Sequence, residues 1–307
     1  MIANLSLCSR ALALAGLMTL LPLGGALADS RTLDGAFGEV KLQGDPQRVV
    51  TLNENALDVA LAVGVQPVGA VATRGGTDVS DYLKRESGKI SIVGTARETN
   101  LESVFALKPD LIIASPDVDK AQYEKLSLIA PTVVLKGSSF DDWRDNVAFY
   151  GQALNKPDAA KAAVAKIDAR IAELKGRIEP GQVASVVRWS PQGAGVMSQH
   201  LFVGQLLGEL GFKGTAMAEE LTKRPHSDPL SLENLSRIDG DWLFLATLNA
   251  DGSKALEQAR QQPAFARLKA VSSGHAVSVD GQIWSSGSGP LAAQVVLDDV
   301  EKAISTQ

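Results

Sequence analysis

Arginine side chains recur in this chain directly after apolar runs that are expected to form buried strands. Arg74 and Arg97 follow the second and third such runs, and Arg188 with Trp189 closes a later one. In sheets of parallel strands, ligands bind beyond the carboxyl ends, where the loops diverge. Guanidinium groups bind carboxylates and similar oxygens through paired hydrogen bonds. These residues therefore predict a cleft for an anionic ligand, although an arginine in a loop can also be a solvated surface charge.

Further features of the second half could serve the same ligand. Trp284 would offer an aromatic surface, or it could simply cap the hydrophobic core. The sequence Gly-Ser-Gly-Pro at 287–290 could turn backbone amides toward an anion at the start of a helix, although a turn followed by proline in the first helical position explains the same residues. His226 lies in a loop at 223–227, and we expect it near the ligand because loops over a cleft often carry function.

The elements that must position these residues form an alternating pattern. Short apolar runs rich in Val and Ile alternate with segments of helical period, which is typical of an α/β protein with mostly parallel sheets and flanking helices. The runs lie at 48–52, 67–72, 91–94, 110–115, 132–136, 184–190, 241–247 and 276–279, and clear helical segments at 55–63, 101–107, 201–210 and 290–304.

One long helical segment at 158–178 interrupts the alternation. At about 1.5 Å per residue it spans roughly 30 Å, the width of a small domain, so we expect a rigid connection between two lobes. A chain of this length also usually divides into two cores. The predicted parts are a signal peptide at 1–28, an N-terminal lobe at 29–156, a connecting helix at 157–179 and a C-terminal lobe at 180–307.

An internal repeat supports two similar lobes. The segments 100–114 and 231–245 align without a gap, with Glu102 on Glu233 and Asp110 on Asp241, 131 positions apart. Each segment reads as a short helix leading into a buried strand. The repeat therefore predicts one glutamate at the same point on each lobe. Both glutamates could also be helix N-terminal carboxylates favoured by the helix dipole.

The first 28 residues indicate export. They carry one charge, Arg10, followed by an apolar run that ends in Ala-Leu-Ala, which is typical of a signal peptide cleaved after Ala28. A retained membrane anchor is the alternative for a run of this length. Cys8, the only cysteine, lies in this segment, so the mature chain offers no disulfide or thiolate chemistry. Its 29 basic and 35 acidic residues make nucleic acid a poor partner.

Signatures of catalysis and of metal binding are absent. The chain has no nucleophile elbow, no phosphate-binding loop and no His-Glu-x-x-His motif. Its three histidines, His200, His226 and His275, lack the spacing of metal ligands. We therefore predict no catalytic residues, no protein-bound metal and no enzyme activity.

Several segments, taken together and in order, resemble the periplasmic substrate-binding proteins of ABC importers for iron-siderophore complexes, haem and cobalamin. Ferric-citrate binding proteins are the most similar. The resemblance rests on PQRVVTL at 46–52, ALAVGVQPVG at 60–69, VG at 93–94, NLESVFALKPDLIIA at 100–114, IAP at 129–131 and the stretch 284–297.

The resemblance implies a class III binding-protein fold, with two lobes, one long helix and little closure on the ligand. It implies capture of a ferric siderophore or ferric carboxylate chelate, of citrate or hydroxamate type, and delivery to a dimeric ABC permease in the inner membrane. Glu102 and Glu233 would form salt bridges with arginines of the two permease subunits. The protein would be a periplasmic monomer, and the chelator would hold the iron, so that no cofactor is needed.

Two alternatives remain. A haem or cobalamin binding protein of the same importer class would use a different ligand, with Tyr82 or His226 as a candidate axial ligand to haem. An exported hydrolase or lyase would use His226 or His200 with a carboxylate. The sequence does not name the chelate.

Overall fold

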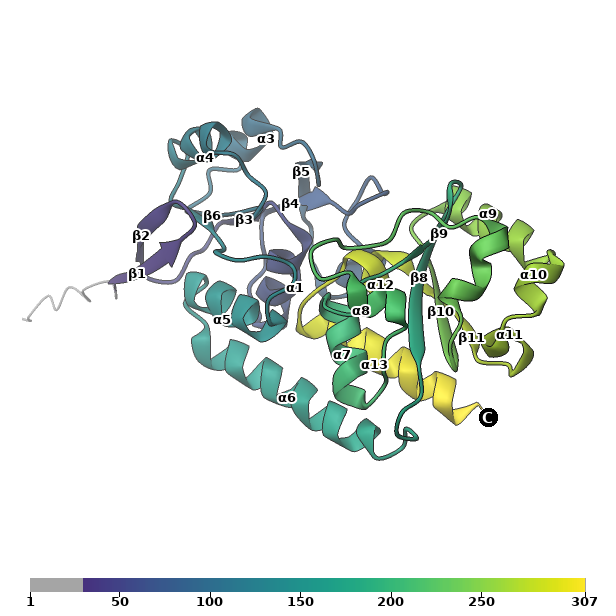
Figure 1. The fold of residues 1–307 in the computed structure, drawn as a ribbon. Coiled ribbons are helices and arrows are strands. Elements are labelled where there is room, and N and C mark those ends of the chain that lie inside the picture. The colour runs from purple at the N-terminus through teal and green to yellow at the C-terminus, as the bar shows by residue number, and fades with distance from the viewer. Residues whose placement is uncertain (1–29, 307) are drawn as a thin grey trace, which may run out of the picture.

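The computed structural model describes residues 30–306, and the predicted signal peptide with Cys8 lies outside this range. Two α/β lobes stand side by side, and a long helix runs beneath both of them (Figure 1). This is the arrangement that the alternating pattern and the connecting helix predict. No helix in the described part of the chain is long and apolar enough to cross a membrane.

The first lobe is built on a five-stranded sheet in the order β5-β4-β3-β6-β7, with all neighbouring pairs parallel. Its strands are apolar because helices cover both faces of such a sheet. The strands are β3 (Val49–Thr51), β4 (Gly69–Ala72), β5 (Ser91–Thr95), β6 (Leu111–Ala114) and β7 (Thr132–Val134), and the helices are α1 (Glu54–Ala62), α2 (Asp81–Glu86), α3 (Leu101–Ala106), α4 (Lys120–Ser127) and α5 (Trp143–Ala153).

An antiparallel hairpin, β1 (Ser30–Gly35) and β2 (Gly38–Gln43), precedes this sheet and was not predicted. It lies at the end of the lobe farthest from the second lobe (Figure 1). The Arg31 guanidinium fastens it by donating to the backbone carbonyls of Gln152 and Ala153, at 2.8 and 2.6 Å. These carbonyls belong to the end of α5, where helical carbonyls lack intrahelical partners.

The second lobe has a four-stranded sheet in the order β11-β10-β8-β9. Strands β8, β10 and β11 are parallel, whereas β9, which was not predicted, pairs antiparallel with β8. The strands are β8 (Ala184–Ser190), β9 (Gly193–Val196), β10 (Trp242–Thr247) and β11 (Ala276–Asp280), and the helices are α7 (Phe202–Leu210), α8 (Ala216–Glu220), the 3-10 helix η1 (Leu232–Ile238), α9 (Ala250–Arg260), α10 (Pro263–Ala266), α11 (Lys269–Ser272), α12 (Gly281–Ser286) and α13 (Pro290–Ser305).

The lobes are joined by α6 (Pro157–Lys175), which the sequence predicts within a few residues. The last helix, α13, packs along α6 and also contacts α1 and α2 of the first lobe. Glu301 on α13 accepts hydrogen bonds from Arg170 and from Arg177, the latter at 2.5 Å. The connection between the lobes is therefore a pair of helices, of which only one was expected.

The repeated segments have equivalent structural roles. Asp110 accepts hydrogen bonds from the backbone N–H groups of Gln47 and Arg48, at 2.7 and 2.9 Å, just before β3. Asp241 accepts one from the N–H of Val183, at 2.7 Å, just before β8. In each lobe the strand that ends the repeat, β6 or β10, pairs with that first strand. The second copy differs from the prediction in one respect, because its helix is a 3-10 helix and not an α-helix.

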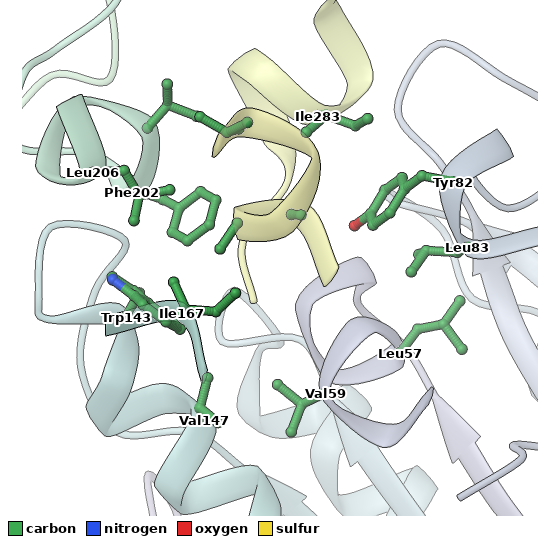
Figure 2. Packing of buried hydrophobic residues seen from close by; sticks show 14 of the residues in the cluster. Leu57, Val59, Tyr82, Leu83, Trp143, Val147, Ile167, Phe202, Leu206 and Ile283 are labelled. Atoms are coloured by element: carbon green, nitrogen blue, oxygen red, sulfur yellow. The ribbon is translucent and has the colours of Figure 1, made fainter. Parts of the chain in front are cut away.

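One hydrophobic core continues from the first lobe into the second (Figure 2). It includes Leu57 and Val147 of the first lobe, Ile167 of α6, and Phe202 and Val296 of the second lobe. Trp143 meets Phe202 edge to face, with ring centroids 5.6 Å apart. The lobes thus have separate sheets but share packing at their base, which opposes wide opening.

A buried carboxylate reinforces this base. Asp58 on α1 is fully buried and accepts hydrogen bonds from the N–H groups of Leu291 and Ala292, at 3.0 and 2.8 Å, in the first turn of α13. The helix dipole favours a negative charge at this position. Burial nevertheless raises the pKa of Asp58 to about 7, although the two amide donors lower it.

We expect the Asp58→Ala variant to unfold more easily than the wild type. Two buried amides would lose their acceptor, at about 1–3 kcal/mol each. Because the folded-state pKa of Asp58 exceeds its unfolded value, its contribution is fully present below the unfolded pKa and declines as pH rises toward 7. The loss of stability should therefore be larger at pH 5.5 than at pH 8, by up to about 2 kcal/mol.

Urea denaturation at several pH values measures this effect. The Asp158→Ala variant is the control, because Asp158 is an exposed residue in the first turn of α6. An Asp58→Ala variant as stable as the control at both pH values would contradict the role assigned to Asp58.

Candidate functional site

The candidate site is a cleft between the two lobes, with a volume of about 510 Å³. Its first-lobe wall comes largely from residues that follow the carboxyl ends of β3, β4, β6 and β7, as expected for parallel sheets. Side chains on its surface are mostly small polar and apolar ones. They include Asn53, Glu54, Arg74, Ser115, Asp117, Ser138, Ser139, Asp141, Val186, Met197, Ser198, Trp284 and Ser285.

Two arginines from different lobes influence each other electrostatically at this cleft, although only Arg74 lines it. Arg74, after β4, lines the cleft and is exposed. Arg188 on β8 is half-buried, and its pKa is lowered first by burial and then by the charge of Arg74. Within residues 30–306, neither guanidinium has an ion-pair or hydrogen-bond partner. Two cations that repel each other and have no ion-pair partner form an unfavourable arrangement that an anionic ligand would relieve.

The other predicted ligand residues have less contact with the cleft. Arg97 is exposed and follows Ala96, which lines the cleft. Trp189 is 4% exposed and packs edge to face on Phe265 within the second lobe, so we do not retain it as a ligand contact. Trp284 borders the cleft but is 1% exposed, and its indole N–H donates to Asp299 at 2.8 Å. Most of the Trp284 side chain is therefore buried in the core, in agreement with the interpretation that it caps the core.

The histidines and Tyr82 offer no obvious ligand to a metal. The Nδ1 atom of His226 lies 2.8 Å from the carbonyl oxygen of Ser227, and its neighbour Pro225 lines the cleft. Tyr82, on α2, is 6% exposed and lies in the buried core near Leu83 and Leu57 (Figure 2). The rings of His275 and Trp242 stack at 4.4 Å. In the described part of the chain, no group of three or more His, Cys, Asp or Glu residues could hold a metal ion.

The glycine-rich turn at 287–290 does bind an anion, but that anion is a side chain of the protein itself. The Asp58 carboxylate accepts hydrogen bonds from the two backbone N–H groups that follow Pro290. Gly289 has φ = 132°, and a Cβ there would lie 2.4 Å from the Asp58 carboxylate. Glycine is therefore required for this close approach. The turn positions the cleft residues 285–288 and does not bind the ligand through these amides.

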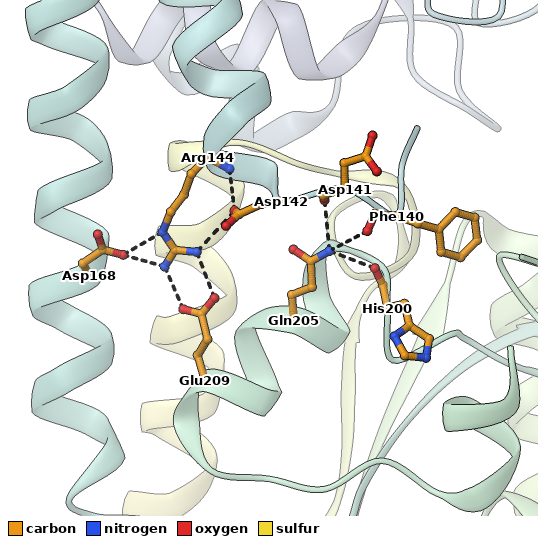
Figure 3. A network of polar contacts seen from close by, with 8 residues as sticks. All are labelled: Phe140, Asp141, Asp142, Arg144, Asp168, His200, Gln205 and Glu209. Carbon is orange, nitrogen blue, oxygen red and sulfur yellow. Dashed lines mark hydrogen bonds and ion pairs between the residues drawn. The ribbon is translucent and has the colours of Figure 1, made fainter. Parts of the chain in front are cut away.

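A polar network fixes one wall of the cleft (Figure 3). Arg144 of α5 binds Asp168 of α6 at 2.5 Å and Glu209 of α7 at 2.7 Å, so it joins both lobes to the connecting helix. Beside it, the Gln205 side chain donates to the carbonyls of Asp141 and His200, at 3.1 and 2.8 Å. These contacts hold the loop at 137–141, which lines the cleft, against the second lobe.

Part of the second-lobe wall was not predicted. Met197, Ser198, the start of α7 and Pro225 all line the cleft. These residues follow strand β9 or lie beside the antiparallel bridge between Met197 and His226. Neither feature belongs to the pattern of parallel strands. The apolar residues at 201–203 gave a helix signal but no indication that the first turn of this helix faces a ligand.

Glu102 and Glu233 lie outside the cleft. Each is exposed in the first turn of its helix, α3 or η1. An exposed apolar side chain accompanies each, Phe105 beside Glu102 and Leu232 beside Glu233, with exposures of 69% and 41%. Neither glutamate takes part in an ion pair within residues 30–306.

Comparison with known families decides the class of protein. A model of the family described as periplasmic binding protein matches residues 49–283. The chain belongs to this periplasmic binding protein family. The family consists of substrate-binding proteins and not of enzymes, and its ligands are bound without a cofactor.

Relatives of this periplasmic binding protein are associated with iron chelates. It is 35% identical to the probable siderophore-binding lipoprotein YfiY of Bacillus subtilis, over 89% of this chain and 87% of the relative. It is 30% identical to the Fe(3+)-citrate-binding protein YfmC of the same species, over 90% and 86%. The crystal structure of Staphylococcus aureus SirA complexed with staphyloferrin B is 27% identical, with a TM-score of 0.78 over 90% of this chain and 98% of that one.

We expect the Arg144→Met variant of this periplasmic binding protein to be destabilised by about 1–3 kcal/mol. Asp168 and Glu209 would then face each other without a cation, in a site where the Arg144 side chain is only 24% exposed. Chemical denaturation measures the change. Arg224→Met, which breaks an exposed pair with Asp228, should cost less than about 1 kcal/mol, and equal losses in both variants would contradict the special role of Arg144.

Proposed function

We propose that this protein captures a ferric siderophore or a ferric carboxylate chelate and delivers it to an ABC permease. The observation that carries the proposal is the pair Arg74, which lines the interlobe cleft, and Arg188, whose pKa the charge of Arg74 lowers; neither has an ion-pair partner within residues 30–306. The names of the relatives, which bind siderophores and ferric citrate, support the same ligand class. A chelate with free oxyanions would supply the missing negative charge, while its chelator holds the iron.

The strength of this interaction can be bounded. A charge-assisted hydrogen bond contributes about 1.5–3 kcal/mol, so two arginines would supply roughly 3–6 kcal/mol before association costs. The remaining affinity would come from apolar contacts with Val186 and Met197 and from hydroxyl groups such as Ser138 and Ser139. We keep Arg97 and His226 as secondary ligand contacts, since each is next to a lining residue.

Haem and cobalamin are less consistent with this cleft. Of its four aromatic lining residues, Trp143 and Trp284 are each 1% exposed and Phe202 is 6% exposed, so only the half-buried Phe140 offers much ring surface to a macrocycle. Tyr82 does not line the cleft. No observation favours these ligands over an iron chelate.

Delivery would use the two exposed glutamates. One glutamate at an equivalent point of each lobe suits a partner with two similar subunits, because a two-fold axis presents the same surface twice. We propose that Glu102 and Glu233 pair with basic residues of a dimeric permease, and that the binding protein acts as a monomer in the periplasm after cleavage behind Ala28.

The Arg74→Ala, Arg188→Ala double variant should bind ferric citrate at least about 100-fold more weakly than the wild type, because each arginine contributes about 1.5–3 kcal/mol. Quenching of intrinsic tryptophan fluorescence gives the dissociation constant. Arg85→Ala removes an exposed cation on α2 and should leave affinity within about threefold. Unchanged affinity in the double variant would refute the proposed ligand site.

The Glu102→Ala, Glu233→Ala double variant should bind the ferric chelate as tightly as the wild type and fail to support import of radioactive iron into cells. Both residues lie outside the cleft, so only docking to the permease should be impaired. The control replaces one exposed glutamate per lobe elsewhere, Glu39 and Glu257, with alanine. Normal import with the Glu102→Ala, Glu233→Ala variant would contradict the proposed role of these residues in docking.

A further inference from the structure

Glu54 is an unexpected residue in a cleft for an anion. It is the first residue of α1 and lines the cleft near Arg74. Its position is fixed, because the Thr73 hydroxyl donates to one carboxylate oxygen at 2.7 Å and the Ser80 hydroxyl donates to the other. The two hydroxyl oxygens lie 2.9 Å apart, so three side chains form one compact cluster.

The Glu54 carboxylate keeps capacity to accept further hydrogen bonds. Each carboxylate oxygen has two acceptor positions, and the hydroxyls occupy one on each. The side chain borders the cleft, so a ligand there can reach the remaining positions. Burial raises the pKa of Glu54, and the nearby Arg74 opposes this shift. Glu54 is thus a hydrogen-bond acceptor beside Arg74, which is a donor.

The other two acidic residues of the cleft differ from Glu54. Asp141 is engaged locally, because its carboxylate accepts from the backbone N–H of Ser138 at 2.7 Å. Asp117 is exposed, and within the described residues its carboxylate has no hydrogen-bond partner. Glu54 alone among these three is both held in place by partners from other elements and desolvated.

This combination excludes a ligand that offers only oxyanions near Glu54. A carboxylate in the chelate would be repelled there, whereas an N–H or O–H group would form a charge-assisted hydrogen bond. A site built to accept a hydrogen bond rejects ligands that leave its buried polar group unpaired. A ligand that fits this site therefore places its oxyanions toward the arginines and a hydrogen-bond donor toward Glu54.

We propose that Glu54 is a specificity-determining residue that selects chelates carrying a hydrogen-bond donor, such as an amide N–H, a free hydroxyl or an ammonium group, beside their anionic part. This inference rests on the proposed function and narrows its ligand class. A citrate-centred dihydroxamate chelator, whose arms are joined through amide N–H groups, meets both requirements. Ferric citrate meets only the requirement for oxyanions.

The test compares two probes, the ferric complex of a citrate-centred dihydroxamate and ferric citrate, by tryptophan fluorescence quenching. The wild type should prefer the dihydroxamate complex. Glu54→Gln, which is isosteric and uncharged, should weaken binding of that complex, strengthen binding of ferric citrate and reduce the preference at least about tenfold. Glu54→Asp keeps the charge but withdraws the carboxylate, so it should weaken the dihydroxamate complex without improving ferric citrate.

The matched control is Asp117→Asn, which removes one negative charge from the cleft mouth. It should shift both dissociation constants by the same factor and leave the preference unchanged. An equal change of both affinities in Glu54→Gln would show that Glu54 only supports the loop of Thr73 and Ser80, and would overturn the inference. Failure of the wild type to bind either probe would instead refute the proposed function.

Discussion

The contact between Asp58 and the first turn of α13 is the constraint on which the geometry of the molecule depends. It joins residues that are 233 and 234 positions apart in the chain, one from each lobe. The carboxylate satisfies two amides of a helix end, and the helix end offsets part of the cost of burying that carboxylate. Because Gly289 allows this close approach and Asp58 holds the turn, the loop at 285–288 lines the cleft from an anchored position.

The charged groups of the cleft depend on this fixed base. Arg74 and Arg188 come from different lobes, and two cations would move apart if the lobes were free to open. The shared core, the contact of Trp143 with Phe202, and the Arg144 network resist that movement. For the proposed ligand site, this means that the two arginines are held in place in advance, which would lower the cost of ordering them when an anion binds.

The sequence allowed the parallel strands, the connecting helix and the repeat to be predicted, because each depends on local hydrophobic period. The antiparallel hairpin β1–β2, the antiparallel strand β9 and the 3-10 form of η1 do not follow the alternating pattern and were missed. At the site, Arg74 was found because it follows a parallel strand. Trp189 was misjudged because it neighbours Arg188 on β8, and adjacent strand residues point to opposite faces.

The N-terminal hairpin also determines how the protein can be attached to something else. Arg31 ties β1 to the end of α5, on the side of the first lobe that faces away from its neighbour (Figure 1). A lipid, a surface linker or a purification tag placed ahead of residue 30 would leave the mouth of the groove unobstructed. The C-terminal end of the described chain lies on α13, which packs against the connecting helix α6. A fusion there would disturb the helix pair that keeps the groove in shape.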